Sequence, residues 1–173
     1  MMNIAVLISG SGSNLQTLID ACERKEIEAK IVSVYSNKKN AYGLKRAEKH
    51  GIKTYHLEDL ESLCDTNYDL IVLAGFLKIL PKSVVEKYEH KIINIHPSLI
   101  PSFCGKGYYG MKVHQAVIDY GVKVTGCTTH FVSEGADEGP IIMQKWLPIE
   151  DHDDAKSIQE KVLELEHTCL VES

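Results

Sequence analysis

The sequence lacks the features that mark several classes of protein. No apolar run approaches the roughly 20 residues that a membrane-spanning helix needs. The N-terminus enters a short apolar segment without a basic leader, so we expect no secretory signal and no membrane contact. Basic residues are not in excess, because 19 Lys and Arg face 24 Asp and Glu, for a net charge of −5. That balance argues against a surface for the nucleic-acid backbone.

Paired cysteines and metal-binding patterns are also missing. The five cysteines are scattered along the chain and include no C-x-x-C pair. This use of cysteine is typical of reduced thiols in a cytoplasmic protein. The eight histidines form no H-E-x-x-H motif and no cluster with cysteine at ligand spacing, so we expect no metal cofactor.

The first half of the chain alternates apolar runs with helical patterns. The runs at 3–8, 30–35, 70–75 and 91–95 predict strands, and the intervening segments, with 41–50 and 81–89 the clearest, predict helices. We expect Gly51 to end the helix at 41–50 and Pro81 to lie in the first turn of the next. Strands that alternate with helices predict a parallel α/β sheet.

The second half has a different pattern. Residues 111–120 and 154–169 show helical spacing, whereas 122–132 and 140–148 alternate apolar and polar residues like an antiparallel pair. No repeat or linker interrupts the 173 residues, so we expect one domain. The predicted fold is a mixed, mainly parallel sheet with helices on both faces and an antiparallel C-terminal part.

The turn after the first predicted strand contains Gly10-Ser11-Gly12. A dinucleotide fingerprint would place a third glycine where Leu15 stands and an acidic residue where the second strand ends in Ser36-Asn37, so we do not expect NAD. No Gly-Lys-Ser/Thr follows, which excludes a P-loop. Backbone amides at the start of a helix, here with Ser13 and Asn14, can bind one phosphate. A plain tight turn is the alternative.

Asn94 and His96 are two residues apart at the end of a predicted strand that Pro97 stops. Side chains alternate along a strand, so both project to the same side. The amide can donate to a developing oxyanion and the imidazole can move protons near neutral pH, which suits acyl-group chemistry. The alternative is a structural histidine at a strand end.

Four further polar residues are candidates for the same site. Asp137 lies in an acidic, glycine-bounded loop, where turn chemistry is the alternative to a contact with His96. Thr128 and His130 lie on the predicted strand at 122–132, and either could support that pair or simply pack. His114, in the predicted helix at 111–120, could likewise line a polar pocket.

Six segments together resemble one enzyme family along the whole chain: IAVLISGSGSNLQ, SNKKNAYGLKRA, LAGFLKIL, NIHPSLIPSF, GVKVTGCTTHFV and DEGPIIMQ. The sequence is similar to the phosphoribosylglycinamide formyltransferases, the folate-dependent glycinamide ribonucleotide transformylases of purine synthesis. The resemblance implies a Rossmann-like formyltransferase fold. It also implies a phosphate-binding half at 1–100 and a folate-binding and catalytic half at 101–173.

The resemblance also implies site residues and ligands. It makes Asn94, His96 and Asp137 the catalytic trio. It assigns the ribonucleotide and its phosphate to Gly12, Ser13, Asn14 and Glu166. The residues that it assigns to the folate, besides Asn94 and Asp137, are Leu77, Lys78, Ile79, Leu80, Ser133, Glu134, Gly135 and Ala136. The implied ligands are the small molecules glycinamide ribonucleotide and 10-formyltetrahydrofolate, the latter as co-substrate, in a cytoplasmic monomer or weak homodimer.

The sequence departs from the family at several places. Thr128 stands where serine is frequent, the loop at 103–109 is longer than in some members, and the segment at 58–66 lacks an arginine that some relatives use toward the folate tail. The family usually continues beyond the helix at 154–169, which is consistent with a trimmed C-terminus.

Three other functions compete with this interpretation. A formyltetrahydrofolate hydrolase would carry an N-terminal regulatory domain, and a methionyl-tRNA formyltransferase a basic C-terminal domain. A non-catalytic phosphosugar-binding domain would keep the turn at 10–14 but would not need Asn94, His96 and Asp137 to converge. The distances among these three side chains therefore discriminate between an enzyme and a binding module.

Overall fold

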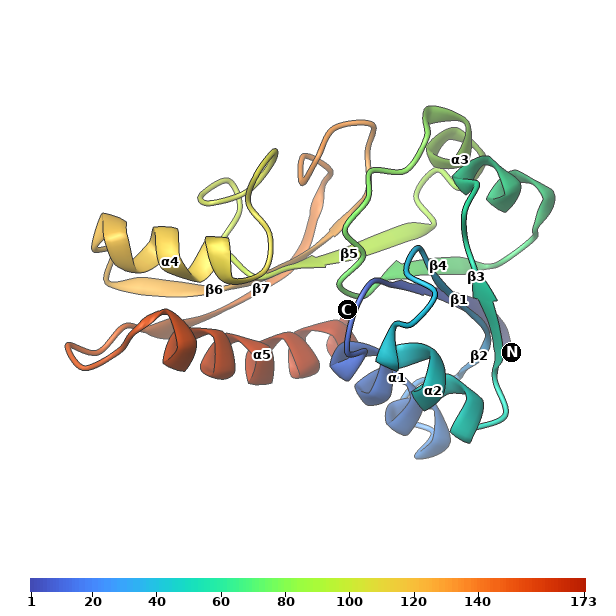
Figure 1. Cartoon of the computed structure of the whole chain (residues 1–173), viewed down its shortest axis with the longest axis horizontal. Helices are drawn as coiled ribbons and strands as arrows, with labels where there is room; N and C mark the ends of the chain where they lie inside the picture. The colour runs from blue at the N-terminus through green and yellow to red at the C-terminus, as the bar shows by residue number, and fades with distance from the viewer.

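The structure is a computed structural model that describes residues 1–173, and it is built on one seven-stranded sheet (Figure 1). The strands are β1 (Met2–Ile8), β2 (Ala29–Ser36), β3 (Lys53–His56), β4 (Leu70–Leu73), β5 (Ile92–His96), β6 (Val124–Phe131) and β7 (Ile141–Pro148). Their order is β3-β2-β1-β4-β5-β6-β7. β1 to β5 pair in parallel, and β6 and β7 are added antiparallel. The predicted mixed sheet is confirmed.

Helices cover both faces of this sheet. They are α1 (Ser13–Glu23), α2 (Tyr42–Lys49), the 3-10 helix η1 (Leu60–Asp65), α3 (Lys82–Lys87), α4 (Met111–Tyr120) and α5 (Ala155–Glu172). In Figure 1, α1, α2 and α5 lie on one side of the sheet and α3 on the other. α5 packs against β6, β7, α1 and α4, so it joins the two halves of the chain. None of these helices combines the length and the apolarity that crossing a membrane requires.

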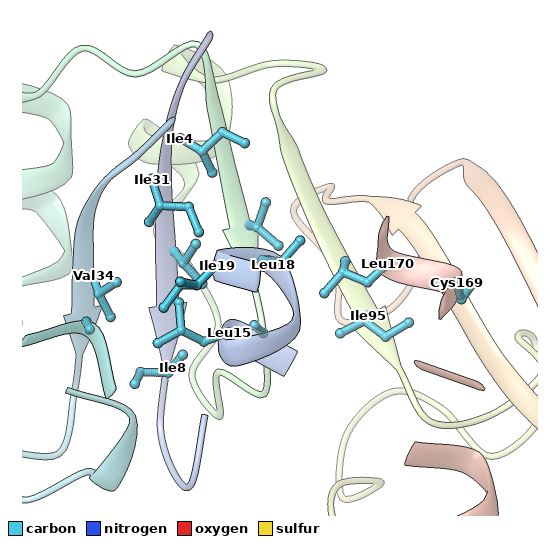
Figure 2. Packing of buried hydrophobic residues seen from close by; sticks show 14 of the residues in the cluster. Ile4, Ile8, Leu15, Leu18, Ile19, Ile31, Val34, Ile95, Cys169 and Leu170 are labelled. Carbon is cyan, nitrogen blue, oxygen red and sulfur yellow. The ribbon is translucent and has the colours of Figure 1, made fainter. Parts of the chain in front are cut away.

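Two apolar clusters fill the space between sheet and helices. Along β1, Ile4, Val6 and Ile8 belong to one cluster, and Ala5 and Leu7 belong to the other. Successive side chains of a strand point to opposite faces, so a strand covered on both faces must be apolar throughout. Figure 2 shows the first cluster, in which residues of α1 and α5 pack on the same face of the sheet.

Helix ends follow local sequence signals, with one exception. Gly51 has φ of 68°, and the amides of Gly51 and Ile52 donate to the carbonyls of Glu48 and Ala47, so it ends α2 as predicted. Pro81, predicted in the first turn of α3, is instead the extended residue before it (φ −60°, ψ 150°), and the helix is shorter than 81–89.

Two short elements did not appear in the sequence analysis. β3 pairs with β2 at the edge of the sheet, and three of its four side chains are exposed. Its sequence, KTYH, contains few apolar residues, because an edge strand with few buried positions does not require them. Asp59 caps the start of η1, and its carboxylate accepts from the amide of Glu61.

A capping box starts α5. The Asp154 carboxylate accepts from the Ser157 amide at 2.8 Å, and the Ser157 hydroxyl accepts from the Asp154 amide at 3.0 Å. Each bond satisfies a backbone donor that the first helical turn leaves free. Because α5 crosses both halves of the chain, its start affects the stability of the whole fold.

We predict that Asp154→Ala lowers the free energy of unfolding by about 1 kcal/mol, the usual effect of losing such a cap. Urea denaturation followed by circular dichroism measures it. Asp151→Ala is the matched control, because Asp151 is exposed and its side chain makes no hydrogen bond or ion pair. Equal changes in the two variants would contradict this role of the cap.

Candidate active site

One large cavity, of about 940 Å³, opens where the parallel strands end. The turns after β1 and β4 line it, as does the C-terminal end of β5. β2 lies on one side of β1 and β4 lies on its other side, so the strand order reverses at β1. Ligands of open α/β sheets bind in such a crevice. Residues on both sides of position 100 line the cavity, so both halves of the chain build the site.

Asn94, His96 and Asp137 meet in this cavity. Asp137 Oδ2 lies 3.4 Å from His96 Nδ1, and Asp137 Oδ1 lies 3.4 Å from Asn94 Nδ2. Asn94 and His96 come from the end of β5, whereas Asp137 comes from the loop between β6 and β7. Asp137 adopts φ of 58°, a left-handed conformation that Asp tolerates better than most residues. The structure therefore brings together the three residues that the resemblance implied.

The loop after β5 completes this arrangement through its backbone. The Phe103 carbonyl lies 2.9 Å from His96 Nε2, and the Gly105 amide donates to Asp137 Oδ2 at 2.9 Å. Because a carbonyl only accepts, His96 Nε2 carries a hydrogen. In the neutral ring Nδ1 is then unprotonated and faces Asp137. This part of the 103–109 loop thus orients both groups.

Burial and charge act on His96 in opposite directions. Burial is the largest influence and lowers the pKa of His96 below its ordinary value of 6.5, with the nearby His130 acting in the same direction. The charge of Asp137 and the Phe103 carbonyl raise that pKa, but not enough to cancel burial. A neutral His96 at pH 7 can accept a proton, and Asp137 then stabilises the charged ring.

Asp137 is ionised in this setting. Burial by itself raises the pKa of its carboxyl group, but the contact with His130, the charge of His96 and the Gly105 amide together lower it below the ordinary value. A buried carboxylate that receives such partners is stabilised in its charged form. The site therefore combines a neutral imidazole with a carboxylate.

His130 positions the amide of Asn94. The two residues are opposite each other in the β5–β6 register, and Asn94 Nδ2 lies 3.0 Å from His130 Nε2. His130 Nδ1 lies 2.9 Å from the Phe131 carbonyl, which assigns the hydrogen to Nδ1 and leaves Nε2 as an acceptor. The NH₂ group of Asn94 is thereby directed toward His130 and Asp137. Only 2% of His130 is exposed.

Thr128 does not support the Asn94–His96 pair from within the cavity, which was one of the roles considered for it. It is opposite His96 in the register, but its hydroxyl donates to the Ser98 carbonyl at 2.7 Å and accepts from the Ile100 amide at 3.1 Å. Thr128 is fully buried and does not line the cavity. It holds the turn after His96 and supplies no partner to the imidazole.

The turn at 10–14 forms one end of the cavity with free backbone donors. Arg46 Nε donates to the Ser11 carbonyl at 2.8 Å from outside. The C=O and N–H of a trans peptide point in opposite directions, so the Gly12 amide points away from Arg46. The amides of Ser13 and Asn14 begin α1 and have no partner within the helix. Three amides are therefore free for an anion.

Two glycines hold this turn against α2. A Cβ on Gly12 would lie 2.6 Å from the Cα of Gly43, and a Cβ on Gly43 would lie 2.3 Å from Cδ1 of Ile8. The Gly43 amide also donates to the Gly10 carbonyl at 3.1 Å. Since Gly12 has φ of 73° as well, both close approach and conformation require glycine at position 12.

Glu166 closes the same end from α5. Its Oε2 accepts from Asn14 Nδ2 at 2.7 Å, and burial raises the pKa of its carboxyl group to about 7. Asn14 Oδ1 is buried in the cavity wall without a hydrogen-bond partner. A buried acceptor without a partner is costly, so it points to a ligand donor at this place.

The predicted folate residues line the middle of the cavity, with one exception. Leu77 to Leu80 form one wall, where Leu77 and Ile79 are 51% and 65% exposed. Ser133, Gly135, Ala136 and Asp137 form another. Glu134 is not part of the wall, because its carboxylate forms an ion pair with Lys82 at 3.0 Å. Glu134 thus tethers its loop to the start of α3.

Some lining residues were missed or left open by the sequence analysis. His114 lines the cavity and is 2% exposed, with Nδ1 unpartnered and a pKa that burial lowers to about 4. Lys38 and Gln159 also line it and were not predicted. Lys38 could have been found, because it follows the carboxyl end of a strand beside β1. Gln159 needed the placement of α5. No group of three or more His, Cys, Asp and Glu residues is arranged to hold a metal ion.

Comparison with known proteins identifies the family. A profile of the formyl transferase family matches residues 2–173. The chain belongs to the formyl transferase family. The phosphoribosylglycinamide formyltransferase of Escherichia coli is 38% identical, over 96% of this chain and 82% of its own length. That of Haemophilus influenzae is 41% identical over the same shares.

Solved structures agree with this membership. Glycinamide ribonucleotide transformylase 1 from Symbiobacterium toebii matches with a TM-score of 0.91 and 36% identity, over 99% of this chain and 85% of that one. Phosphoribosylglycinamide formyltransferase from Anaplasma phagocytophilum matches with a TM-score of 0.88 and 40% identity, over 99% and 84%. The predicted fold and family are confirmed.

Other relatives are much longer. Trifunctional purine biosynthetic protein adenosine-3 is 42% identical in Gallus gallus and 44% identical in Bos taurus. This chain is covered to 98% and 95% in these matches but spans only 18% and 17% of the relatives' lengths. In the chloroplastic phosphoribosylglycinamide formyltransferase of Vigna unguiculata it spans 58% at 37% identity.

The opposing influences on His96 lead to a prediction for its titration. Asp137→Asn removes the charge that raises the pKa of His96, so this pKa should fall further below 6.5. NMR titration of the His96 ring in both forms measures the change. Glu138→Gln is the control, since it removes a charge from the adjacent residue, which has no such contact with His96. An unmoved His96 pKa in Asp137→Asn would remove Asp137 as its partner.

Proposed function

We propose that this chain transfers the formyl group of 10-formyltetrahydrofolate to the amine of 5′-phosphoribosylglycinamide (glycinamide ribonucleotide), a step of de novo purine biosynthesis. The observation that carries the proposal is the convergence of Asn94, His96 and Asp137 within 3.4 Å contacts in the cavity. A binding module for phosphosugars would not need this convergence. Both ligands are small molecules, and we propose no role for nucleic acid, membrane, NAD or metal.

The reaction begins with attack of the substrate amine on the formyl carbon. A new C–N bond forms, and the formyl oxygen becomes an oxyanion in a tetrahedral intermediate. One hydrogen of the Asn94 NH₂ group stays on His130, and the other leaves its long contact with Asp137, at 3.4 Å, to donate to this oxygen. The loss of one such donor costs about 10²–10³ in rate.

His96 moves the proton that the reaction displaces. Its unprotonated Nδ1 accepts the proton of the attacking amine, and Asp137 stabilises the resulting imidazolium. The proton then passes to the folate nitrogen as the bond from that nitrogen to the formyl carbon breaks. An amine is already a good nucleophile, so the proposal includes no metal and no covalent enzyme intermediate.

The two substrates occupy different parts of the cavity in this proposal. The phosphate of the ribonucleotide binds the amides of Gly12, Ser13 and Asn14, and Glu166 lies beside the same ligand. The folate lies between the Leu77–Leu80 wall and the 133–137 loop. We further propose that the protein works in the cytoplasm, as a monomer or weak homodimer.

The deciding experiment is a formyl-transfer assay with glycinamide ribonucleotide and a formylated folate, run with and without the acceptor. Formyl release that depends on the acceptor supports transfer. Release at the same rate without the acceptor would instead indicate a hydrolase, which passes the group to water.

His96→Ala should lower kcat by about 10²–10⁴, the usual contribution of a positioned general acid–base. Folding and folate binding should persist, since the ring lies at a strand end. His56→Ala is the control, because His56 pairs only with Glu58 on the sheet edge. A folded His96→Ala protein with near-normal kcat would exclude His96 from the chemistry.

Ser13→Asp should weaken ribonucleotide binding, because a carboxylate at the start of α1 repels the ligand phosphate. Calorimetry with each substrate measures the effect, and folate affinity should stay the same. Ser13→Ala is the control, since it keeps the backbone amide and adds no charge. Unchanged ribonucleotide affinity in Ser13→Asp would place the phosphate elsewhere.

A further inference from the structure

Three cationic side chains line the cavity, and they come from different places in the fold. Lys78 follows β4 in the Leu77–Leu80 wall, and Lys106 belongs to the loop after β5. Lys38 follows β2, the strand on the other side of β1 from β4. The predicted folate wall follows β4, on one side of the 10–14 turn. Of the three lysines, only Lys38 lies on the other side of that turn.

The strand register places Lys38 beside the free amides. Ile8, the last residue of β1, pairs with Ser36, the last residue of β2. Lys38 follows its strand end by two residues, as Gly10 follows the end of β1. Adjacent strands lie roughly 4.8 Å apart, so the two turns start as neighbours.

Hydrogen bonds join these two turns. Ser9 Oγ donates to Asn37 Oδ1 at 2.6 Å, next to Lys38 in the chain. The Lys38 amide donates to Ser36 Oγ at 3.1 Å, and the Lys38 carbonyl accepts from the Ala41 amide at 3.1 Å. The backbone that carries Lys38 is therefore held in place relative to the 10–14 turn.

The ammonium group of Lys38 has no partner in the protein. Its backbone is engaged, but its Nζ makes no hydrogen bond and lies within 4.0 Å of no carboxylate. The nearby Arg46 differs, because it donates to the Ser11 carbonyl from outside the turn and does not line the cavity. Lys38 thus lines the cavity as a cation without a protein partner, and its backbone lies beside the turn in which three amides are also free.

The opposite wall at this end carries a carboxyl group and no cation. Glu166 lies there, hydrogen-bonded to Asn14, so an anion bound deep beside α5 would meet a carboxyl group. A phosphate is attracted toward Lys38 and away from Glu166. The buried and unpartnered Asn14 Oδ1 is an acceptor on this wall, so it calls for a hydroxyl of the ligand and not for its phosphate.

We infer that Lys38 binds the phosphate group of the ribonucleotide, which it holds between its ammonium and the amides of Gly12, Ser13 and Asn14. This inference rests on the proposed function for the identity of the substrate. Lys38 then makes the site specific for the phosphorylated substrate over the corresponding riboside. A point charge on a flexible stem can follow a phosphate without demanding one geometry.

The test compares Lys38→Met with Lys39→Met, its matched control. Lys39 is the next residue and equally a surface lysine, but it does not line the cavity. Calorimetry should show that Lys38→Met weakens glycinamide ribonucleotide binding roughly ten- to a hundredfold, the range for a hydrogen bond to a charged group. Binding of glycinamide riboside, which lacks the phosphate, and of the folate should not change. Lys38→Arg should restore most of the affinity.

Two results would overturn the inference. One is unchanged ribonucleotide affinity in Lys38→Met. The other is an equal loss in Lys39→Met, which would indicate a general effect of surface charge. The phosphate site should bind a sugar phosphate even if glycinamide ribonucleotide is not the substrate, so ribose 5-phosphate serves as a second probe. Its affinity should fall in Lys38→Met and not in Lys39→Met.

The second probe separates this inference from the proposed function. If the wild-type protein fails to formylate glycinamide ribonucleotide but binds ribose 5-phosphate through Lys38, the proposed function fails and the phosphate site stands. If the protein is an active transferase whose KM for the ribonucleotide does not rise in Lys38→Met, only the role of Lys38 fails. Wild-type protein that binds neither phosphorylated ligand would overturn the phosphate site itself.

Discussion

The contact between the Asp137 carboxylate and the His96 imidazole is the interaction on which the site depends. Both groups are largely buried, and burial by itself disfavours the charged form of each. Burial raises the pKa of Asp137, but the contact with His130, the charge that His96 carries when it is protonated and the Gly105 amide together keep it below its ordinary value. His96 stays neutral but close to a charge that can stabilise its protonated form. A proton can therefore be accepted and released at this place at small cost.

This contact depends on the fold of the loop between β6 and β7. β6 runs antiparallel to β5, so His130 lies opposite Asn94, and Phe131, the last residue of β6, pairs with Ile93 near the start of β5. The loop therefore leaves the sheet at the amino end of β5, where the Val132 amide donates to the Ile92 carbonyl at 2.9 Å. It folds back along β5, so that Asp137 reaches Asn94 and His96. The antiparallel strand supplies His130, and the loop after it supplies the carboxylate.

The other end of the cavity depends on backbone rather than on side-chain charge. Gly12 and Gly43 approach so closely that neither could carry a side chain without displacing its neighbour. Their contact, with Arg46 bound to the Ser11 carbonyl, holds a turn whose three amides have no partner in the protein. Such donors are already oriented before a ligand arrives, which limits the entropy lost on binding.

The sequence by itself determined the sheet, most helix boundaries and the shared face of Asn94 and His96, because these follow from local periodicity and from glycine and proline positions. The resemblance to a family named Asp137 and Glu166 and also Glu134, whose side chain points away from the cavity to Lys82. The short polar strand β3 was not predicted, because an edge strand buries few side chains and so needs little apolar sequence. Only the tertiary structure decided that Asp137 reaches His96, that Thr128 turns toward the 98–100 turn, and that burial outweighs charge at His96. Each of these outcomes depends on contacts between residues far apart in the chain and on the exclusion of solvent by those contacts. No local sequence pattern encodes such contacts.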